Sequence, residues 1–354
     1  MPSLTSFGRK IINWYQKHKR ELPWRDTKDP YHIWLSEIIL QQTRVDQGMA
    51  YYLRFVETYP TVKSLAAAGQ DNILKLWQGL GYYSRARNLH HAAQEVVKKY
   101  NGAFPSSYND IRSLKGIGDY TAAAISSFAF DLPYAVVDGN VYRLLSRYFG
   151  IETPIDSTSG KKQFAELAQK LLNGHAPAVF NQAIMEFGAI QCKPVSPECT
   201  SCPLADSCFA FDKKRVSELP VKQKKTAIRK RYFHYLVIHH NKYIYLRQRT
   251  GKDIWQGLHD FPLIERSKHL SPEQLIASAE WKEIFGTQKT TLVKSHAEIK
   301  HILSHQHIHA RFYEMKAGKN FRVPKDSAWK KATSKTLHKY AIPRLIEQYF
   351  ENNA

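Results

Sequence analysis

The sequence is poor in cysteine, in acidic residues and in long apolar runs. Its 354 residues include only four cysteines, all between positions 192 and 208. A disulfide scaffold uses cysteines spread along a small secreted chain, so that class of protein is disfavoured. No apolar stretch approaches the roughly 20 residues that span a bilayer. The first twenty residues contain no apolar signal core. We therefore expect a soluble, cytoplasmic protein with no membrane association.

The shortage of acidic residues leaves a strongly basic chain. Lys and Arg number 52 against 31 Asp and Glu, for a formal net charge of +21. Such a surface attracts polyanions, so nucleic acid is the expected partner and an anionic membrane surface is the weaker alternative. Hydrophobic residues make up 43% of the chain, which is enough to build ordered cores. At about 100–200 residues per domain, the length predicts two domains.

The pattern of residues changes near position 212. Before it, apolar residues recur at helical spacing in 30–47, 63–77, 84–99, 121–130, 140–149, 161–172 and 177–190. Segment 213–231 then carries nine Lys or Arg and one Glu, which indicates a solvated linker that either solubilises the chain or contacts phosphates. Beyond it, a hairpin is expected at 232–239 and 243–249, strands at 291–294 and 306–315, and helices at 272–285 and 342–350. The predicted organisation is a mainly α region over 1–212, a basic linker over 213–231 and a smaller α+β domain over 232–354.

The four cysteines have the spacing Cys-x6-Cys-x2-Cys-x5-Cys. Their tight grouping indicates one shared ligand site, with two disulfides as the alternative. Four thiolates hold either a single zinc ion or an iron–sulfur cluster. Structural zinc sites usually have two close pairs, and only Cys199 and Cys202 form one here. The spacing therefore favours the cluster, but only modestly.

A Gly-x-Gly turn precedes an alanine-rich helix. Gly116 and Gly118 permit a tight turn, and the helix expected at 121–130 begins directly after them. The start of a helix offers unpaired N–H groups to a phosphate. Most such turns are ordinary, but one between helices in a basic chain favours a helix–hairpin–helix that clamps DNA.

Two carboxylates have the setting of an acid–base pair. On a helix, Glu37 has Ile33, Trp34 and Leu40 as neighbours, and burial among such residues raises a carboxyl pKa toward neutrality. The alternative for Glu37 is a buried ion pair with Arg44 or another Arg. Asp138 precedes a predicted helix, where an N-cap is the alternative role. A carboxylic acid with a raised pKa opposite an ionised carboxylate is the usual arrangement for hydrolysing a glycosidic bond.

Six motifs together resemble the adenine DNA glycosylases (MutY-type) of the helix–hairpin–helix, iron–sulfur superfamily. They are Leu22-Pro23-Trp24-Arg25, residues 36–43 (SEIILQQT), residues 79–86 (GLGYYSRA), residues 116–122 (GIGDYTA), Val137-Asp138-Gly139-Asn140, and the four cysteines. The resemblance spans nearly the whole chain. It implies two helical subdomains followed by a Nudix-like domain, and a monomer that acts on nucleoid DNA. It also implies a [4Fe–4S] cluster, rather than zinc, on Cys192, Cys199, Cys202 and Cys208.

The activity that this resemblance implies is removal of adenine mispaired with 8-oxoguanine or guanine in duplex DNA. The adenine leaves the base stack, Glu37 protonates it at N7, and Asp138 stabilises or captures the cationic sugar. Tyr120 and Asn140 orient this assembly. Positions matching the base pocket are Trp24, which packing alone also explains, Arg25 and Gln182. The similar endonuclease III-like enzymes have a nucleophilic Lys in place of Tyr120; a phenol forms no imine, so a monofunctional enzyme is expected.

Recognition of the opposite base is implied at a second group of positions. These are Gln41, Gln42, Thr43, Leu80, Tyr82, Ser304 and His305, with Gly116 and Gly118 on the DNA backbone. Leu303 departs from the aromatic residue common in the recognition loop. In the Nudix-like domain, residues 272–286 lack the Glu cluster that binds the catalytic metal. The domain is therefore expected to bind DNA at the mispair rather than to hydrolyse nucleotides. His305, His307 and His309 alternate along a predicted strand and are expected to form a polar face toward solvent or DNA rather than a metal site.

Two other functions are compatible with parts of the sequence. An endonuclease III-like glycosylase with lyase activity is disfavoured by Tyr120 and by the additional domain. A non-catalytic iron–sulfur protein that binds DNA or senses redox state needs the hairpin and the cysteines. It does not need Glu37 together with Asp138.

Overall fold

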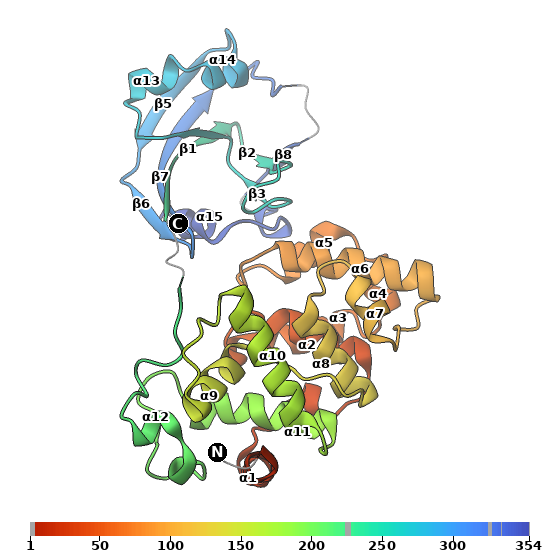
Figure 1. The fold of residues 1–354 in the computed structure, drawn as a ribbon. Helices are drawn as coiled ribbons and strands as arrows, with labels where there is room; N and C mark the ends of the chain where they lie inside the picture. The colour runs from red at the N-terminus through yellow and green to blue at the C-terminus, as the bar shows by residue number, and fades with distance from the viewer. Residues whose placement is uncertain (1–3, 224–227, 325–327, 334, 354) are drawn as a thin grey trace. The chain divides into compact units, whose positions relative to one another are not determined.

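The chain divides into two compact units in its computed structural model, which describes residues 4–223, 228–324, 328–333 and 335–353 (Figure 1). The helical unit comprises Met1–Ala67 and His91–Lys225. The second unit comprises Ala68–His90 and Thr226–Ala354. A short piece of the helical region, 68–90, therefore clusters with the carboxy-terminal part of the chain. The predicted boundaries at 212 and 232 stay a prediction.

The helical unit is built around two helices that are apolar on every side. α2 (Pro30–Leu40) and α8 (Asp119–Phe130) pack against each other and are buried along most of their length (Figure 1). Around them lie α1 (Leu4–His18), α3 (Val45–Thr58), α4 (Val62–Ala67), the last part of α6 (Ser84–Tyr100), α7 (Tyr108–Ser113), α9 (Gly139–Phe149), α10 (Thr158–Leu172) and α11 (Pro177–Glu186). Short turns complete the unit: η1 (Pro23–Arg25), the π-helical η2 (Phe187–Gln191), η3 (Ala205–Ser207) and α12 (Phe209–Asp212). Helices that are apolar all round belong in a core, so α2 and α8 position whatever side chains they carry deep in the unit.

Each predicted helical stretch contains a helix, but two are interrupted. Residues 30–47 break after Leu40, because Gln42 has a positive φ of 57° and Arg44 is extended before α3. Residues 63–77 divide into α4 and α5 (Gln70–Leu76), which belongs to the second unit. α1 lies outside the predicted helical stretches, although Phe7, Ile11 and Trp14 recur at helical spacing and are buried. Among the described residues, no helix has the length and apolar character needed to cross a membrane.

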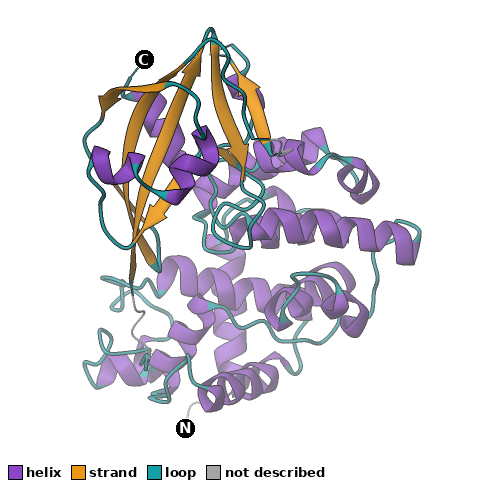
Figure 2. Cartoon of the chain, turned by 90° about the horizontal axis from the view of Figure 1, so that it is seen from above, coloured by secondary structure: helices purple, strands orange, loops and turns teal. Residues whose placement is uncertain are grey.

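The second unit contains one twisted eight-stranded sheet (Figure 2). Its main path runs β3-β2-β1-β7-β5, while β4 pairs with β1, β6 with β7 and β8 with β2. The strands are β1 (Arg229–His240), β2 (Tyr243–Gln248), β3 (His259–Asp260), β4 (Leu263–Arg266), β5 (Thr290–Ser295), β6 (Ile299–Ile302), β7 (Gln306–Ala317) and β8 (Trp329–Ala332). The long β1 and β7 are parallel and the other pairs are antiparallel. Besides α5 and the first part of α6, the helices of this unit are α13 (Pro272–Ile276), α14 (Ala279–Phe285) and α15 (Arg344–Glu351), with a turn η4 (Leu337–Lys339).

The predicted hairpin and strands of this unit are present, with shifted ends. The largest shift is at β1, which begins at Arg229, so the last three residues of the predicted linker belong to the sheet. Residues 224–227 of that linker lie outside the described residues. The expected helix at 272–285 is interrupted at Ala277 and Ser278, where Ser278 caps α14 by accepting from the Trp281 N–H. The short β3, β4, β6 and β8 have too few residues for a recognisable alternation.

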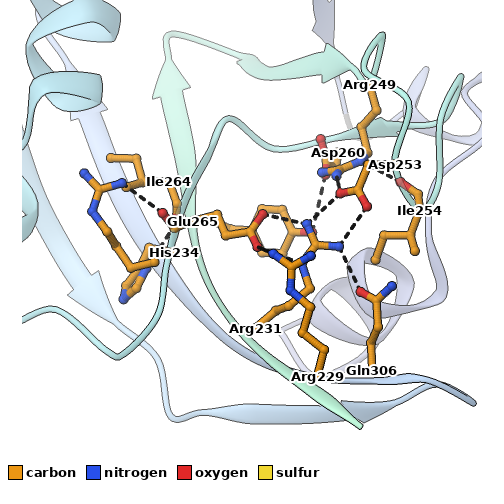
Figure 3. Close-up of polar contacts among 12 residues, drawn as sticks. Arg229, Arg231, His234, Arg249, Asp253, Ile254, Asp260, Ile264, Glu265 and Gln306 are labelled. Atoms are coloured by element: carbon orange, nitrogen blue, oxygen red, sulfur yellow. Dashed lines mark hydrogen bonds and ion pairs between the residues drawn. The ribbon is translucent and has the colours of Figure 1, made fainter. Parts of the chain in front are cut away.

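Arg231, the last residue of the basic segment 213–231, is buried in the second unit rather than exposed in a linker. Its side chain is only 4% exposed and lies between two carboxylates, Asp253 and Glu265, with two hydrogen bonds to each (Figure 3). It also donates to Gln306, at 2.9 Å. A buried cation needs such partners, and they come from three separate segments. Arg231 therefore joins β1 to the 250–257 loop and to the start of β7.

A candidate active site of two carboxylates

A cavity of about 810 Å³ lies in the helical unit. That volume is within the range of roughly 300–1,000 Å³ typical of ligand pockets. Its walls come from η1, α2, the turn after α2, α8, the start of α9 and α11. All the catalytic and base-pocket residues predicted from the sequence line it: Trp24, Arg25, Glu37, Tyr120, Asp138, Asn140 and Gln182. The two carboxylates thus face one cavity rather than opposite sides of the protein.

Glu37 has the properties expected of a general acid. It lies on α2 and is 8% exposed, and its Oε2 accepts a hydrogen bond of 2.8 Å from the Tyr120 hydroxyl on α8. Burial raises the pKa of Glu37 to about 7; the field of Asp138 adds to the rise, while the Tyr120 hydrogen bond and Arg25 oppose it. In the described part of the chain no cation forms an ion pair with Glu37, so the predicted alternative of a partner at Arg44 is not supported. Such an acid is half protonated near neutral pH.

Asp138 is a helix cap, and it also lies in the wall of the cavity. It is the N-cap of α9, where Oδ1 accepts from the backbone N–H groups of Asn140 and Val141 at 2.9 and 2.8 Å. Its other oxygen accepts from Asn140 Nδ2 at 2.7 Å. Burial raises the pKa of Asp138 above its ordinary value, whereas these three hydrogen bonds and the nearby Arg143 favour its ionised form. The cap therefore also supplies a fixed carboxylate at the cavity wall.

The predicted base-pocket residues are held by partners that sequence reasoning missed. Arg25 donates to Glu186, whose side chain is 1% exposed and also accepts from Arg20. Burial alone would raise the pKa of Glu186, but the hydrogen bonds from Arg20 and Arg25 outweigh it and hold the pKa at about 2. Gln182 accepts from the Tyr15 hydroxyl at 2.7 Å. Glu186 lies one helical turn after Gln182. This spacing from a predicted pocket residue is the one feature of the sequence that could have identified it.

Arg143 is a further residue that was not predicted from the sequence. Its guanidinium donates to Asn140 Oδ1 at 2.8 Å and to the carbonyl oxygens of Gly188 and Cys192 at 2.6 and 2.8 Å. It therefore ties the start of α9 to the chain that enters the cysteine loop. Arg143 follows Asn140 by three residues, and residues i and i+3 share a helix face. This spacing could have identified it from the sequence.

The residues predicted to read the opposite base fall into two groups. Gln41, Gln42 and Thr43 form the turn between α2 and α3 and line the active-site cavity. Leu80, Tyr82, Ser304 and His305 lie in the second unit, where they line a separate cavity of about 450 Å³. Within it the Tyr82 hydroxyl and Ser304 Oγ are 2.5 Å apart, which is a hydrogen bond between segments 222 residues apart.

The predicted hairpin lies between α7 and α8. Gly116 has a φ of +81°, which disfavours any residue with a side chain. Gly118 is the N-cap of α8, and a Cβ there would meet no atom within 4 Å. The start of α8 is therefore open on this side, as a phosphate contact requires.

The four cysteines line one small cavity. Cys192, Cys199, Cys202 and Cys208 share it with apolar side chains, among them Leu144, Phe187 and Leu204. The buried Arg147 donates to Cys192 Sγ at 3.4 Å. None of the four is in a disulfide. Four free thiols in an apolar pocket, with a buried cation beside them, fit a metal centre of net negative charge.

Family models match both parts of the chain. A model for HhH-GPD superfamily base excision DNA repair proteins matches residues 35–173, and a NUDIX domain model matches residues 234–352. The chain resembles the structure of a thermostable thymine-DNA glycosylase, with a TM-score of 0.55 and 32% identity over 59% of this chain and 97% of that one. An endonuclease III–DNA complex shares the fold, with a TM-score of 0.53 and 22% identity over 60% of this chain and 99% of that one. Fold and site define a DNA glycosylase of the helix–hairpin–helix superfamily, an enzyme of base excision repair.

Relatives of known activity narrow the class. The adenine DNA glycosylase of Buchnera aphidicola subsp. Schizaphis graminum (strain Sg) is 32% identical over 352 residues, which are 98% of each chain. That of Buchnera aphidicola subsp. Acyrthosiphon pisum (strain APS) is 37% identical over 72% of this chain and 73% of the relative. The human adenine DNA glycosylase is 41% identical over 58% of this chain and 40% of the relative. The chain belongs to the adenine DNA glycosylase family, and the predicted family, fold class and enzyme class are confirmed.

Proposed function

We propose that the enzyme removes adenine mispaired with 8-oxoguanine, or with guanine, from duplex DNA, and that it does so without cutting the strand. The observation that carries the chemistry is the pair Glu37 and Asp138 in one cavity, with a Glu37 pKa of about 7 and a hydrogen-bonded Asp138. Two carboxyl groups with such different surroundings suit acid and ionised roles.

The proposed reaction begins with the adenine flipped into the cavity. Glu37 donates its proton to N7, and the bond between N9 and C1′ breaks with its electron pair going to the purine. The sugar is left as an oxocarbenium ion, which Asp138 stabilises by charge or captures as an ester. The Glu37 carboxylate then takes a proton from water, whose oxygen bonds to C1′. If the ester has formed, its bond between C1′ and the Asp138 oxygen breaks and the electron pair returns to the carboxylate. Free adenine and an abasic site are the products.

The surrounding residues have supporting roles in this proposal. Tyr120 orients Glu37, and Asn140 orients Asp138 through the contacts described above. Trp24, Arg25 and Gln182 contact the flipped base. Because the hydroxyl of Tyr120 cannot form an imine with the sugar, no strand-cleaving step is expected.

Recognition of the opposite base is assigned to both cavities. Gln41, Gln42 and Thr43 occupy the space beside the flipped adenine, and Gly116 and Gly118 hold the DNA backbone. Leu80, Tyr82, Ser304 and His305 form the surface for 8-oxoguanine. In this proposal residues 1–212 carry the chemistry, 213–231 link, and 232–354 bind the lesion as a module without hydrolase activity. The enzyme acts as a monomer on nucleoid DNA in the cytoplasm.

The four cysteines fit a [4Fe–4S] cluster as their ligand group. The free thiols, their apolar pocket and the adjacent Arg147 suit a site of net negative charge. When bound, the cluster would organise the loop 192–208 and take no part in the hydrolysis. Arg143 and Arg147 anchor this loop to α9 through the carbonyl oxygens of Cys192 and Lys193.

The cluster gives a first testable prediction. Protein purified without oxygen is expected to absorb broadly in the visible range and to contain about four iron atoms per chain. Serine in place of Cys202 should lower both quantities, because that thiol is one of the four ligands. A colourless protein with one zinc per chain would contradict the cluster and support a zinc site made by the four thiolates.

The substrate proposal is tested with duplexes that carry adenine opposite 8-oxoguanine, guanine or thymine. Single-turnover excision should be fastest opposite 8-oxoguanine, slower opposite guanine and slowest opposite thymine. Strand breaks should appear only after alkali treatment, which cleaves abasic sites. Equal rates on all three duplexes would overturn the mispair assignment, and strand breaks without alkali would overturn the monofunctional one.

Ser304→Ala is the matched variant for this experiment. It removes the hydroxyl that bonds to Tyr82 while leaving the active-site cavity unchanged. The preference for 8-oxoguanine over guanine is expected to fall by about 5–13-fold, since one hydrogen bond contributes roughly 1–1.5 kcal/mol.

A further inference from the structure

A cluster of two histidines and one glutamate lies in the second unit, and none of the three residues lines either cavity. His269 Nε2 and His309 Nδ1 contact the two oxygens of Glu298, at 2.5 and 2.6 Å. The ligand atoms that the three side chains offer all lie within 4.8 Å of one another. The three residues come from the loop after β4, the loop before β6 and the strand β7. Packing of distant segments has therefore produced the cluster, rather than local sequence.

The sheet holds two sides of this cluster in place. On β1, Tyr232 is paired with His309 of β7 and with Arg266 at the end of β4. Its ring stacks on that of His309, with centroids 4.9 Å apart and an interplanar angle of 17°, and meets the ring of His269 edge-on at 4.9 Å. Tyr232 therefore packs against both imidazole rings and restricts their orientation.

A buried histidine fixes the loop that carries His269. His234 Nδ1 lies 3.1 Å from the Ile264 carbonyl oxygen (Figure 3), and its Nε2 accepts from the Leu270 backbone N–H at 3.0 Å. Because Nε2 accepts from a backbone N–H and Nδ1 faces a carbonyl oxygen, these partners require the proton on Nδ1. Because Leu270 follows His269 directly, the loop is pinned beside the sheet rather than free in solvent.

The donor set selects a class of metal. Two imidazoles and one carboxylate are the ligands of many zinc sites, and they suit other divalent first-row metals with a position left open. The two oxygens of Glu298 each contact one imidazole, so the carboxylate lies between the two histidines, where a shared ion would bind. The side chains are 16–32% exposed, so an ion can enter from solvent.

We propose that His269, Glu298 and His309 bind one zinc ion or a similar divalent transition metal. Metal binding through His269 Nε2 and His309 Nδ1 requires that the imidazole protons lie on the outer nitrogens, His269 Nδ1 and His309 Nε2. Those two nitrogens are buried and have no hydrogen-bond partner in the described structure. Partners at that position usually improve affinity by about 10–100-fold, so a site of moderate affinity is expected. This site differs from the polar face expected for His309 from the sequence.

The site also has a consequence for the β6–β7 hairpin. Glu298 directly precedes β6, and His309 lies opposite Lys300 in the pairing of β6 with β7. A metal would therefore join both arms of the hairpin at its base, while Ser304 lies at its tip. Backbone amides of 299–310 should exchange more slowly with deuterium when metal is bound.

The test uses the full chain with its cysteine site already loaded, so that thiols do not compete. Zinc is titrated by calorimetry into the parent protein, Glu298→Gln, His269→Asn and the control His296→Gln. His296 contacts Glu314 at 2.6 Å, and among the described residues this pair is not part of a group of three close ligand atoms, so it is a matched histidine–glutamate pair without a complete ligand set. The parent and His296→Gln should bind one zinc more than the other two variants, or bind it on the order of a hundredfold more tightly.

Cobalt identifies the ligands. Cobalt added to the parent protein should give ligand-field absorption without the intense sulfur-to-metal bands that thiolates produce, and Glu298→Gln should lose this absorption. Circular dichroism establishes that the variants fold, and two variants on different segments guard against one that does not. Equal zinc binding by all four proteins, or cobalt spectra with only sulfur bands, would overturn the proposal.

Discussion

Glutamine at position 37 is expected to lower the single-turnover rate of adenine excision by about 10²–10⁴-fold, the usual contribution of a positioned general acid. The amide has the size of the carboxylic acid and its oxygen still accepts from Tyr120, so the cavity keeps its shape. It has no acidic proton to give to N7 and cannot take one from water. The measurement is adenine release under enzyme excess, with DNA binding followed separately. A variant that excises at the parent rate would contradict the assigned role.

Stability provides an independent check on Glu37. Its folded pKa of about 7 lies above the ordinary value for a Glu, so the folded state favours the protonated form. The stability associated with this group is fully present below the unfolded pKa and is lost as pH rises through about 7. Glu37→Gln should therefore be more stable than the parent at pH 8, and their difference should shrink at pH 5. Denaturant unfolding at the two pH values measures this.

The pH profile of the parent enzyme follows from the same pKa. Excision should decrease above pH 7 as Glu37 loses its proton, because the ionised form cannot protonate adenine. Tyr120→Phe removes a hydrogen bond that favours the ionised carboxylate, so this limb should move to higher pH. A limb at the same pH in both proteins would show that another group controls the rate.

Asparagine at position 138 is expected to lower excision by about 10²–10³-fold, a typical loss when one preorganised electrostatic contact is removed. The change removes the negative charge opposite the cationic sugar and any oxygen nucleophile. It should leave the helix start almost intact, because Asn caps helices about as well as Asp and still accepts from the N–H groups of Asn140 and Val141. Asp138→Asn is thus expected to lose activity while keeping nearly the stability of the parent.

Two further variants make that separation measurable. Asp138→Ala should lose both the charge and the cap, adding about 0.5–2 kcal/mol of destabilisation. Asp29→Asn changes the N-cap of α2, where Asp29 accepts from the Tyr31 N–H at 2.8 Å, and it is not part of the active-site cavity. It should excise at nearly the parent rate. If Asp138→Asn also excised normally, Asp138 would be only a helix cap.

Local patterns in the sequence were sufficient where the structure depends on neighbours along the chain. The helical spacing of 84–99, 140–149 and 161–172 corresponds to α6, α9 and α10, because one apolar face per helix is visible at i, i+3 and i+4. The break at 41–44 was not visible, because a positive φ at Gln42 leaves no compositional mark. Arg231 falls in the predicted linker because its partners Asp253 and Glu265 lie 22 and 34 residues further along the chain, beyond the range of any local pattern.

The sequence by itself determined the residue types of the site, the four grouped cysteines and the family to which they point. It could not determine that α2 and α8 lie side by side, and this packing places the Tyr120 hydroxyl against Glu37, 83 residues earlier. Only the tertiary structure decided the burial that raises the pKa of Glu37, the Glu186 contacts that hold Arg25, and the meeting of His269, Glu298 and His309. The physical reason is that burial and electrostatic fields depend on distances through space, whereas helical and strand periodicities depend only on distance along the chain.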